Sequence, residues 1–175
     1  MRVLVISGSP RKNSITQYAM KYVFEYTKTK EVEVDFINLS EDQIEYFKGS
    51  DVVYDEVTRK AAQKIMESDV WLIGTPIYNS FFSSALKNLF EFVNYKKTQG
   101  KVAGIVIMAS GNIGFIDVQT LITQLLSYFR VITNPKAVFL TIDSVSDNKL
   151  SDETAKKRLM EMVDETLKIS FKLKS

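Results

Sequence analysis

The chain has 175 residues, a formal net charge of +2, 45% hydrophobic residues and 25% charged residues, as expected for one soluble globular domain. It contains no cysteine and no histidine, which excludes disulfides, thiolate nucleophiles, iron–sulfur clusters, histidine-dependent triads and the usual zinc sites. The small net charge does not favour nucleic acid as a partner. Enzymatic chemistry in this chain is therefore expected to depend on a bound cofactor.

The beginning of the sequence, MRVLVISGS, predicts a strand and not a signal peptide, because no long apolar region or cleavage site follows it. The apolar runs are much shorter than the ~20 residues of a membrane-spanning helix. We expect a cytoplasmic protein that makes no membrane contact. Repeats, linkers and low-complexity segments are absent from the sequence, so a single domain over residues 1–175 is predicted.

Apolar runs and apolar periodicity predict five strands and five helices in strict alternation. The strands are expected at residues 3–6, 32–36, 70–73, 102–108 and 137–142. The helices are expected at residues 15–26, 57–65, 83–95 and 118–129, and from residue 151 onward. Residues 39–55 are polar and acidic and predict a loop or a short helix.

Strict alternation of strands and helices predicts an α/β fold in three layers, with a parallel sheet covered by helices on both faces. In the second strand, Val32, Val34 and Phe36 alternate with acidic residues, which indicates a strand that is exposed on one face or lies at a sheet edge. Right-handed crossovers and this edge strand favour the strand order 2-1-3-4-5.

In such a sheet, ligands bind beyond the carboxyl ends of the strands, near the point where the strand order reverses. The loops expected there are residues 8–14, 75–80 and 109–114. Residues 8–14 read Gly-Ser-Pro-Arg-Lys-Asn-Ser and precede a helix, so hydroxyls, a guanidinium and a helix N-terminus favour phosphate binding. The alternative is a capped turn with solvated charges. The loop contains neither a GxGxxG dinucleotide motif nor a Walker motif.

The second loop, Thr-Pro-Ile-Tyr-Asn-Ser at residues 75–80, could hold a flat heterocycle by stacking and edge hydrogen bonds. A turn whose aromatic residues only pack explains the same pattern. The third loop begins Ala-Ser-Gly-Asn at residue 109, and its glycines would allow a ligand close to the backbone. A tight strand-to-helix turn is the alternative, so the prediction of a site depends on all three loops meeting at one edge.

Three motifs resemble those of the NADPH-dependent FMN reductases, a family of the flavodoxin-like superfamily that includes azoreductases and quinone reductases. Gly8-Ser9-Pro10-Arg11 with Ser14 is similar to the family's phosphate loop. The segments TPIYN at residues 75–79 and SALKN at residues 84–88 resemble its flavin-edge loop and the following helix. Ala109-Ser110-Gly111 resembles its glycine-rich third loop. Two positions depart from the family: Ile77 stands where many members have glutamate, and Asn112 replaces a second glycine.

The resemblance implies a flavodoxin-like fold that binds FMN, with NADPH or NADH as co-substrate and no side chain acting as acid or base. The first loop would hold the phosphate, the second would line the isoalloxazine edge, and the third would cover the pyrimidine end. The implied cofactor-binding residues are Ser9, Arg11, Ser14, Ile15, Thr16, Pro76, Ile77, Tyr78, Asn79, Ser110, Gly111 and Asn112. No metal ligand is implied.

The function implied is hydride transfer from NAD(P)H to the flavin, followed by reduction of a free flavin, a quinone or an azo compound. The alternative is a non-catalytic electron carrier like flavodoxin. Flavodoxins are strongly acidic and lack arginine in the phosphate loop, whereas this sequence has a pI of about 8.6 and places Arg11 there. The sequence therefore favours the enzyme.

The resemblance also implies a homodimer or homotetramer. Phe81, Phe82 and Phe92 lie outside the apolar stripe of the helix predicted at residues 83–95, so they could form an exposed apolar patch between subunits. Alternatively, these phenylalanines pack under residues 39–55 within one chain.

Overall fold

The computed structural model describes residues 1–174, and its main sheet has the order β2-β1-β3-β5-β6. β6 and β7 pair with successive parts of β5, so together they occupy the fifth position. The predicted order 2-1-3-4-5 is therefore confirmed. The strands are β1 (Arg2–Ser7), β2 (Glu33–Asn38), β3 (Val70–Tyr78), β4 (Phe81–Phe82), β5 (Val102–Ala109), β6 (Ile132–Thr133), β7 (Val138–Thr141), β8 (Val145–Ser146) and β9 (Lys149–Leu150).

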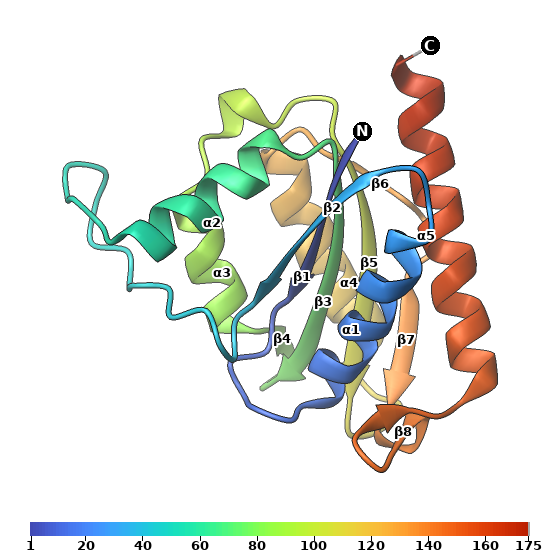
Figure 1. Ribbon diagram of the computed structural model, residues 1–175. Helices are drawn as coiled ribbons and strands as arrows, with labels where there is room; N and C mark the ends of the chain where they lie inside the picture. The colour runs from blue at the N-terminus through green and yellow to red at the C-terminus, as the bar shows by residue number, and fades with distance from the viewer. Residues whose placement is uncertain (175) are drawn as a thin grey trace.

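Helices cover both faces of the sheet (Figure 1). One face packs against α1 (Ile15–Lys28) and α5 (Glu153–Lys174). The other face packs against α2 (Glu56–Glu67), α3 (Ser84–Glu91) and α4 (Phe115–Tyr128). The fold is therefore the three-layer flavodoxin-like arrangement that the sequence predicts.

The central strands are apolar on both sides because both sides are covered. In β1, Val3 and Val5 contribute to the core under α1 and α5, while Leu4 and Ile6 contribute to the core on the opposite face. All four side chains are at most 1% exposed. The edge strand β2 alternates exposed and partly buried residues before its buried end, as its sequence pattern indicates.

The boundary predicted for the third strand is wrong, because β3 continues through Pro76 to Tyr78. β1 pairs with β3 only as far as Gly74, whereas β5 pairs with β3 to Pro76. Beyond Gly74, one side of β3 is therefore an edge, where a proline without an N–H group is tolerated. β3 then turns back into β4, with Tyr78 opposite Phe81.

The fifth strand begins earlier than predicted and is interrupted in the middle. Asn134 leaves the ladder after its N–H donates to the oxygen of Ala103 at 2.8 Å, and Pro135 follows. The helix predicted at residues 83–95 ends at Glu91, and a short 3₁₀ turn follows at Tyr95–Lys97. A 3₁₀ turn at Ile142–Ser144 and the β8–β9 hairpin precede α5. The sequence pattern predicted Ile142 as the end of the fifth strand and no element at residues 143–150.

Residues 39–55 form an irregular segment that covers part of α3, so the loop alternative is the correct one. Phe92 packs edge-on against Phe47 and Tyr54 of this segment, with ring centroids 5.3 and 4.7 Å apart. Phe82 is 4% exposed, whereas Phe81 is 45% exposed. The predicted apolar patch is therefore wrong for Phe82 and Phe92, which pack within one chain.

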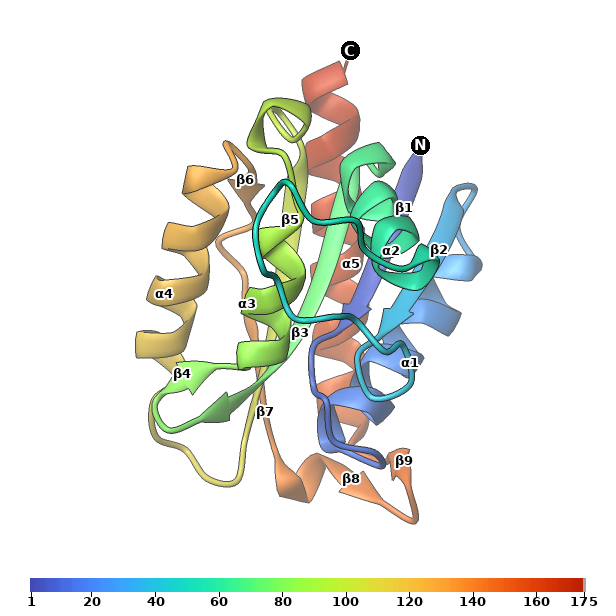
Figure 2. The ribbon, with the colours of Figure 1, turned by 90° about the vertical axis from the view of Figure 1, so that its left-hand side faces the viewer.

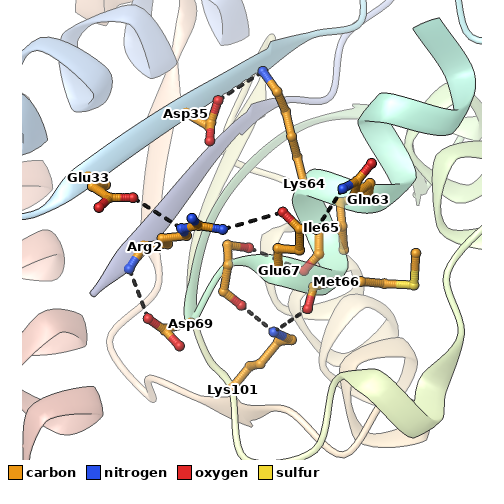
Figure 3. Close-up of polar contacts among 11 residues, drawn as sticks. Arg2, Glu33, Asp35, Gln63, Lys64, Ile65, Met66, Glu67, Asp69 and Lys101 are labelled. Atoms are coloured by element: carbon orange, nitrogen blue, oxygen red, sulfur yellow. Dashed lines mark hydrogen bonds and ion pairs between the residues drawn. The ribbon is translucent and has the colours of Figure 1, made fainter. Parts of the chain in front are cut away.

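The amino ends of the strands are tied together by polar contacts (Figure 3). The guanidinium of Arg2 pairs with Glu33 at 3.1 Å and Glu67 at 3.4 Å, and the backbone N–H of Arg2 donates to Asp69 at 2.8 Å. Lys101 donates to the backbone oxygens of Met66 and Ser68 at the end of α2. Burial lowers the pKa of the Lys101 ammonium, and the charge of Asp69 opposes this shift. At the end of the sheet opposite the predicted site, these polar side chains are therefore engaged in contacts within the chain.

Within residues 1–174, no helix is long and apolar enough to cross a membrane.

Candidate functional site at the carboxyl edge of the sheet

The loops that follow β1, β3 and β5 lie at one end of the sheet (Figure 2). The first of these loops is joined to β3 by a backbone hydrogen bond from the N–H of Gly8 to the oxygen of Gly74, 2.8 Å long. A Cβ atom on Gly8 would lie 2.7 Å from that oxygen. Only glycine allows this approach without moving the backbone, so Gly8 lets the first loop lie close to β3.

A cleft of about 420 Å³ opens between the three loops. This volume lies within the range of small-molecule sites, roughly 300–1,000 Å³. Of the residues predicted to bind the cofactor, those that line the cleft are Arg11, Ser14, Ile15, Thr16, Pro76, Ile77, Tyr78 and Ser110. The structure therefore brings together residues from all three predicted loops.

The N-terminus of α1 forms one end of the cleft. Ser14 caps the helix, and its Oγ accepts the N–H of Gln17 at 3.1 Å. The first backbone N–H groups of a helix have no acceptor within it, so those of Ile15 and Thr16 are available to an anion. Arg11 is exposed beside them, and within residues 1–174 its guanidinium has no ion-pair or hydrogen-bond partner. This end of the cleft suits a phosphate group.

Ser9 lies behind the cleft and does not line it. Its side chain is fully buried, and its Oγ accepts the N–H of Arg11 at 3.3 Å. The same Oγ lies 3.3 Å from the hydroxyl of Tyr78. Ser9 therefore shapes the loop that carries Arg11 and connects it to β3.

The second predicted loop is a tight hairpin. Asn79 and Ser80, between β3 and β4, have φ angles of 48° and 62°. Two consecutive left-handed residues are typical of the turns that reverse a strand in two residues. The turn directs Asn79 into a neighbouring cleft of about 620 Å³, while Tyr78 lines both clefts.

In the third loop, Ser110 lines the main cleft, and Gly111 and Asn112 line a smaller adjoining cleft of about 210 Å³. A Cβ atom on Gly111 would meet nothing within 4 Å, and its φ lies outside the left-handed range. Neither packing nor backbone conformation requires glycine at this position. A ligand that approaches this backbone would require it.

Sequence reasoning missed four residues of the main cleft: Asn13, Met108, Ala109 and Ile142. Asn13 and Ala109 belong to the loops that were identified, and Met108 is the buried residue before Ala109 in β5. Ile142 follows β7, far along the chain, and the pattern there predicted only the end of a strand. No sequence signal placed it at the site.

Another cleft, of about 720 Å³, lies beside residues 39–44 and includes Lys12, Glu41 and Asp42. Two carboxylates and one ammonium give the lining of this cleft a net negative charge, which disfavours the binding of a phosphate. The main cleft offers a guanidinium and free helix amides at one end and apolar walls from Ile77, Met108 and Ile142. These residues fit FMN, which has a phosphate at one end and a flat ring at the other.

The family model for NADPH-dependent FMN reductases matches residues 1–144. The NAD(P)H-dependent FAD/FMN reductase of Geobacillus thermodenitrificans is 27% identical over 147 residues, covering 83% of this chain and 80% of the relative. The FMN-dependent NADPH-azoreductase of Staphylococcus aureus is 31% identical over 137 residues, covering 75% of this chain and 69% of the relative.

Solved structures support the fold. An NAD(P)H:(acceptor) oxidoreductase flavoenzyme from Paracoccus denitrificans has a TM-score of 0.78 and 22% identity, covering 98% of this chain and 97% of its own. The apo form of an NADH:FMN oxidoreductase has a TM-score of 0.76 and 16% identity, covering 98% of this chain and 89% of its own.

Proposed function

Because this chain belongs to the NADPH-dependent FMN reductase family, we propose that its main cleft binds FMN and that the bound flavin is reduced by NADPH or NADH. The observation that carries this proposal is the cleft of about 420 Å³ between the three loops, with Arg11 and the N-terminus of α1 at one end. Of the residues in its walls, those that belong to segments resembling the family's motifs are Arg11, Ser14, Pro76, Ile77, Tyr78, Ala109 and Ser110.

In this assignment the phosphate of FMN binds at the N-terminus of α1. The guanidinium of Arg11 and the N–H groups of Ile15 and Thr16 donate to it, and the Ser14 hydroxyl lies beside them. Ser9 holds the loop in place through its contact with the N–H of Arg11. The positive end of the helix and the guanidinium together balance the negative charge of the phosphate.

The end of β3 and the third loop would hold the ring of FMN. Pro76, Ile77 and Tyr78 would provide a wall and backbone groups on one side, and Ser110 and Gly111 would provide the other. When bound, FMN would supply the redox chemistry, which is hydride acceptance from a nicotinamide and electron donation to an acceptor. The chain supplies binding and orientation, in keeping with a sequence that has no histidine or cysteine.

The acceptor that we propose is a small, flat, uncharged molecule such as a quinone or an azo compound. Tyr78 separates the main cleft from the neighbouring cleft of about 620 Å³, in which Phe47 and Phe81 are partly exposed. Lys87 and Glu91 in that cleft pair with each other, so they add no net charge to it. Aromatic walls without net charge favour an aromatic acceptor over an ionic one.

We also propose that the chain self-associates as a homodimer or homotetramer, through a surface other than Phe82 and Phe92. β4 contacts α4, and near this contact Phe81 is 45% exposed, Ile113 89% and Ile116 66%. Pairing with a second copy would bury these side chains. Light scattering should give at least twice 20.0 kDa. An active monomer would contradict self-association.

The function is tested by following the oxidation of NADPH and NADH with FMN, menadione or an azo dye as acceptor. We expect oxidation that requires FMN and continues over many turnovers. A protein that binds FMN but does not oxidise either nucleotide would instead be an electron carrier of the flavodoxin type.

A further inference from the structure

Ile142 lines the main cleft from outside the three loops. It follows β7 and is 55% exposed, although isoleucine side chains are more often buried. An apolar side chain that is exposed toward a binding cleft gains favourable burial when a ligand covers it. The position of Ile142 therefore bears on how FMN is held.

The chain after Ile142 folds back in a closed turn. The 3₁₀ turn at Ile142–Ser144 leads into the β8–β9 hairpin, whose turn residues Asp147 and Asn148 have φ angles of 48° and 59°. The N–H of Ser151 donates to the oxygen of Ser144 at 3.0 Å and closes the base of the hairpin. We call residues 142–150 the hairpin segment.

The hairpin segment is attached to α1, the helix that begins at the proposed phosphate site. The Tyr18 hydroxyl donates to Oδ1 of Asn148 at 2.9 Å. Tyr18 lies one helical turn after Ser14, and its N–H donates to the Ser14 oxygen at 3.2 Å. Leu150 is 6% exposed in the core under α1 and α5. The turn of the hairpin and its last residue are thus both anchored, and Ile142 lies at the other end.

From these contacts we infer that Tyr18 and Asn148 are positioning residues that hold Ile142 against bound FMN and slow its release. The inference rests on the proposed function, because it assumes that FMN occupies the main cleft. The family model ends at residue 144, so most of the hairpin segment lies beyond it. Without the Tyr18–Asn148 hydrogen bond, Leu150 would still attach the hairpin segment to the core, but the turn of the hairpin would lose this contact with α1. Ile142 would then move away from the main cleft more readily.

The test compares Tyr18→Phe, Asn148→Gly and Ile142→Ala with wild-type protein. The readouts are the rate constant for FMN release and the FMN dissociation constant, both followed by flavin fluorescence. Each variant should release FMN about 3–10-fold faster, the range expected for losing one hydrogen bond or a partly buried apolar contact. The double variant Tyr18→Phe/Asn148→Gly should release FMN no faster than either single variant, because both remove the same bond.

Two variants serve as matched controls. Tyr26→Phe also removes a tyrosine hydrogen bond from α1, here to Asp164 of α5 at 2.8 Å, but far from the cleft. Asp147→Gly introduces glycine at the neighbouring left-handed position, so it matches the backbone effect of Asn148→Gly. Both controls should release FMN at the wild-type rate. Melting temperatures without FMN show whether any variant is misfolded.

Release rates of Tyr18→Phe and Asn148→Gly that equal those of their controls would overturn the role of the hairpin segment. An unchanged rate in Ile142→Ala would overturn the contact with FMN. If wild-type protein itself fails to bind FMN, the proposed function fails, and the two failures are therefore distinguishable.

Discussion

Arg11 and Gly111 stand at opposite ends of the proposed FMN site, and each has a property that the folded chain alone does not explain. Arg11 is a cation without a partner within residues 1–174, beside a helix N-terminus. Gly111 has neither a crowded Cβ position nor a left-handed backbone. Both residues can therefore be changed with little effect on folding, which makes them direct tests of binding.

Replacing Arg11 with alanine should weaken FMN binding by about 1.5–3 kcal/mol, the usual contribution of a charge-assisted hydrogen bond. Titration calorimetry measures the loss. Riboflavin lacks the phosphate and should bind both proteins about equally well. An equal loss for riboflavin would show that Arg11 acts elsewhere in the site.

Replacing Gly111 with alanine should leave the free energy of unfolding within about 0.5 kcal/mol of the wild type, since the added methyl group meets open space. FMN affinity should nevertheless fall, because the methyl group would occupy space that the ring needs. Urea denaturation and FMN titration measure the two effects. Unchanged affinity would place the ring away from the third loop.

At this scale the sequence identified most of the main cleft, because Arg11, Ser14 and Ser110 follow strands, Pro76 lies near the end of a strand, and the carboxyl ends of these strands meet at one edge. Ile142 was not predicted to line the cleft, because its position depends on how the chain turns after β7. Such a turn has no apolar periodicity to indicate it.

At the scale of elements, close packing between α1 and β3 fixes the geometry behind the site. A Cβ atom on Gly74 would lie 2.3 Å from Cγ and 2.4 Å from Sδ of Met20, which is fully buried. Gly74 is also the last residue of β3 that pairs with β1. The helix whose N-terminus is the proposed phosphate site is thus packed directly against β3, the strand proposed to line the ring.

Replacing Gly74 with alanine should destabilise the protein by about 1–3 kcal/mol, because Met20 must move in a filled core. Urea denaturation measures the change, and Gly111→Ala is the control for the same substitution in open space. A stability equal to wild type would mean that Met20 moves freely and that this packing is loose.

Asp69, directly before β3, links the starts of β1 and β3 to the end of α5. Its partial burial would raise the pKa of the carboxyl, but Lys174 at the end of α5 and the backbone N–H of Arg2 outweigh this and hold the pKa below its usual value. A carboxyl with a lowered pKa in the folded state stabilises the fold above its unfolded pKa. That contribution disappears as the pH falls through the folded pKa.

Asp69→Asn keeps an acceptor for the N–H of Arg2 and removes only the charge. At neutral pH the variant should be about 0.5–1 kcal/mol less stable, as for a partly exposed ion pair. The difference should persist down to about pH 3.8 and shrink below it. Denaturation at several pH values checks this, and a difference that does not change with pH would exclude the carboxylate as its source.

The sequence identified the order of the elements better than their ends. Uninterrupted apolar runs indicated strands that are buried on both faces, and apolar stripes indicated helices that are buried on one face. These two patterns together predict a sheet between two layers of helices. Pro76 was interpreted as the end of a strand, but it lies in β3 where one side is an edge. The pairing of β4 with β3 and the pairing of β8 with β9 each involve only two residues from each strand. Such pairs are too short to show alternation, so tertiary contacts decide them.

Over the whole molecule, the two ends of the sheet differ in kind. At the amino ends, the polar groups of Arg2, Asp69 and Lys101 form hydrogen bonds and ion pairs with other residues of the chain (Figure 3). At the carboxyl ends, Arg11 and the first amides of α1 keep polar groups available. A parallel sheet directs its helix N-termini to this end, so the architecture itself places anion binding here.

The measurement that tests the central claim most directly is amide hydrogen exchange of the purified protein with and without FMN. FMN should slow exchange in residues 11–16, 77–79 and 109–112, and leave residues 64–69 and 101–103 at the other end of the sheet unchanged. Protection confined to residues 39–46, beside the cleft of about 720 Å³, or no protection in any of the three loops, would contradict the account.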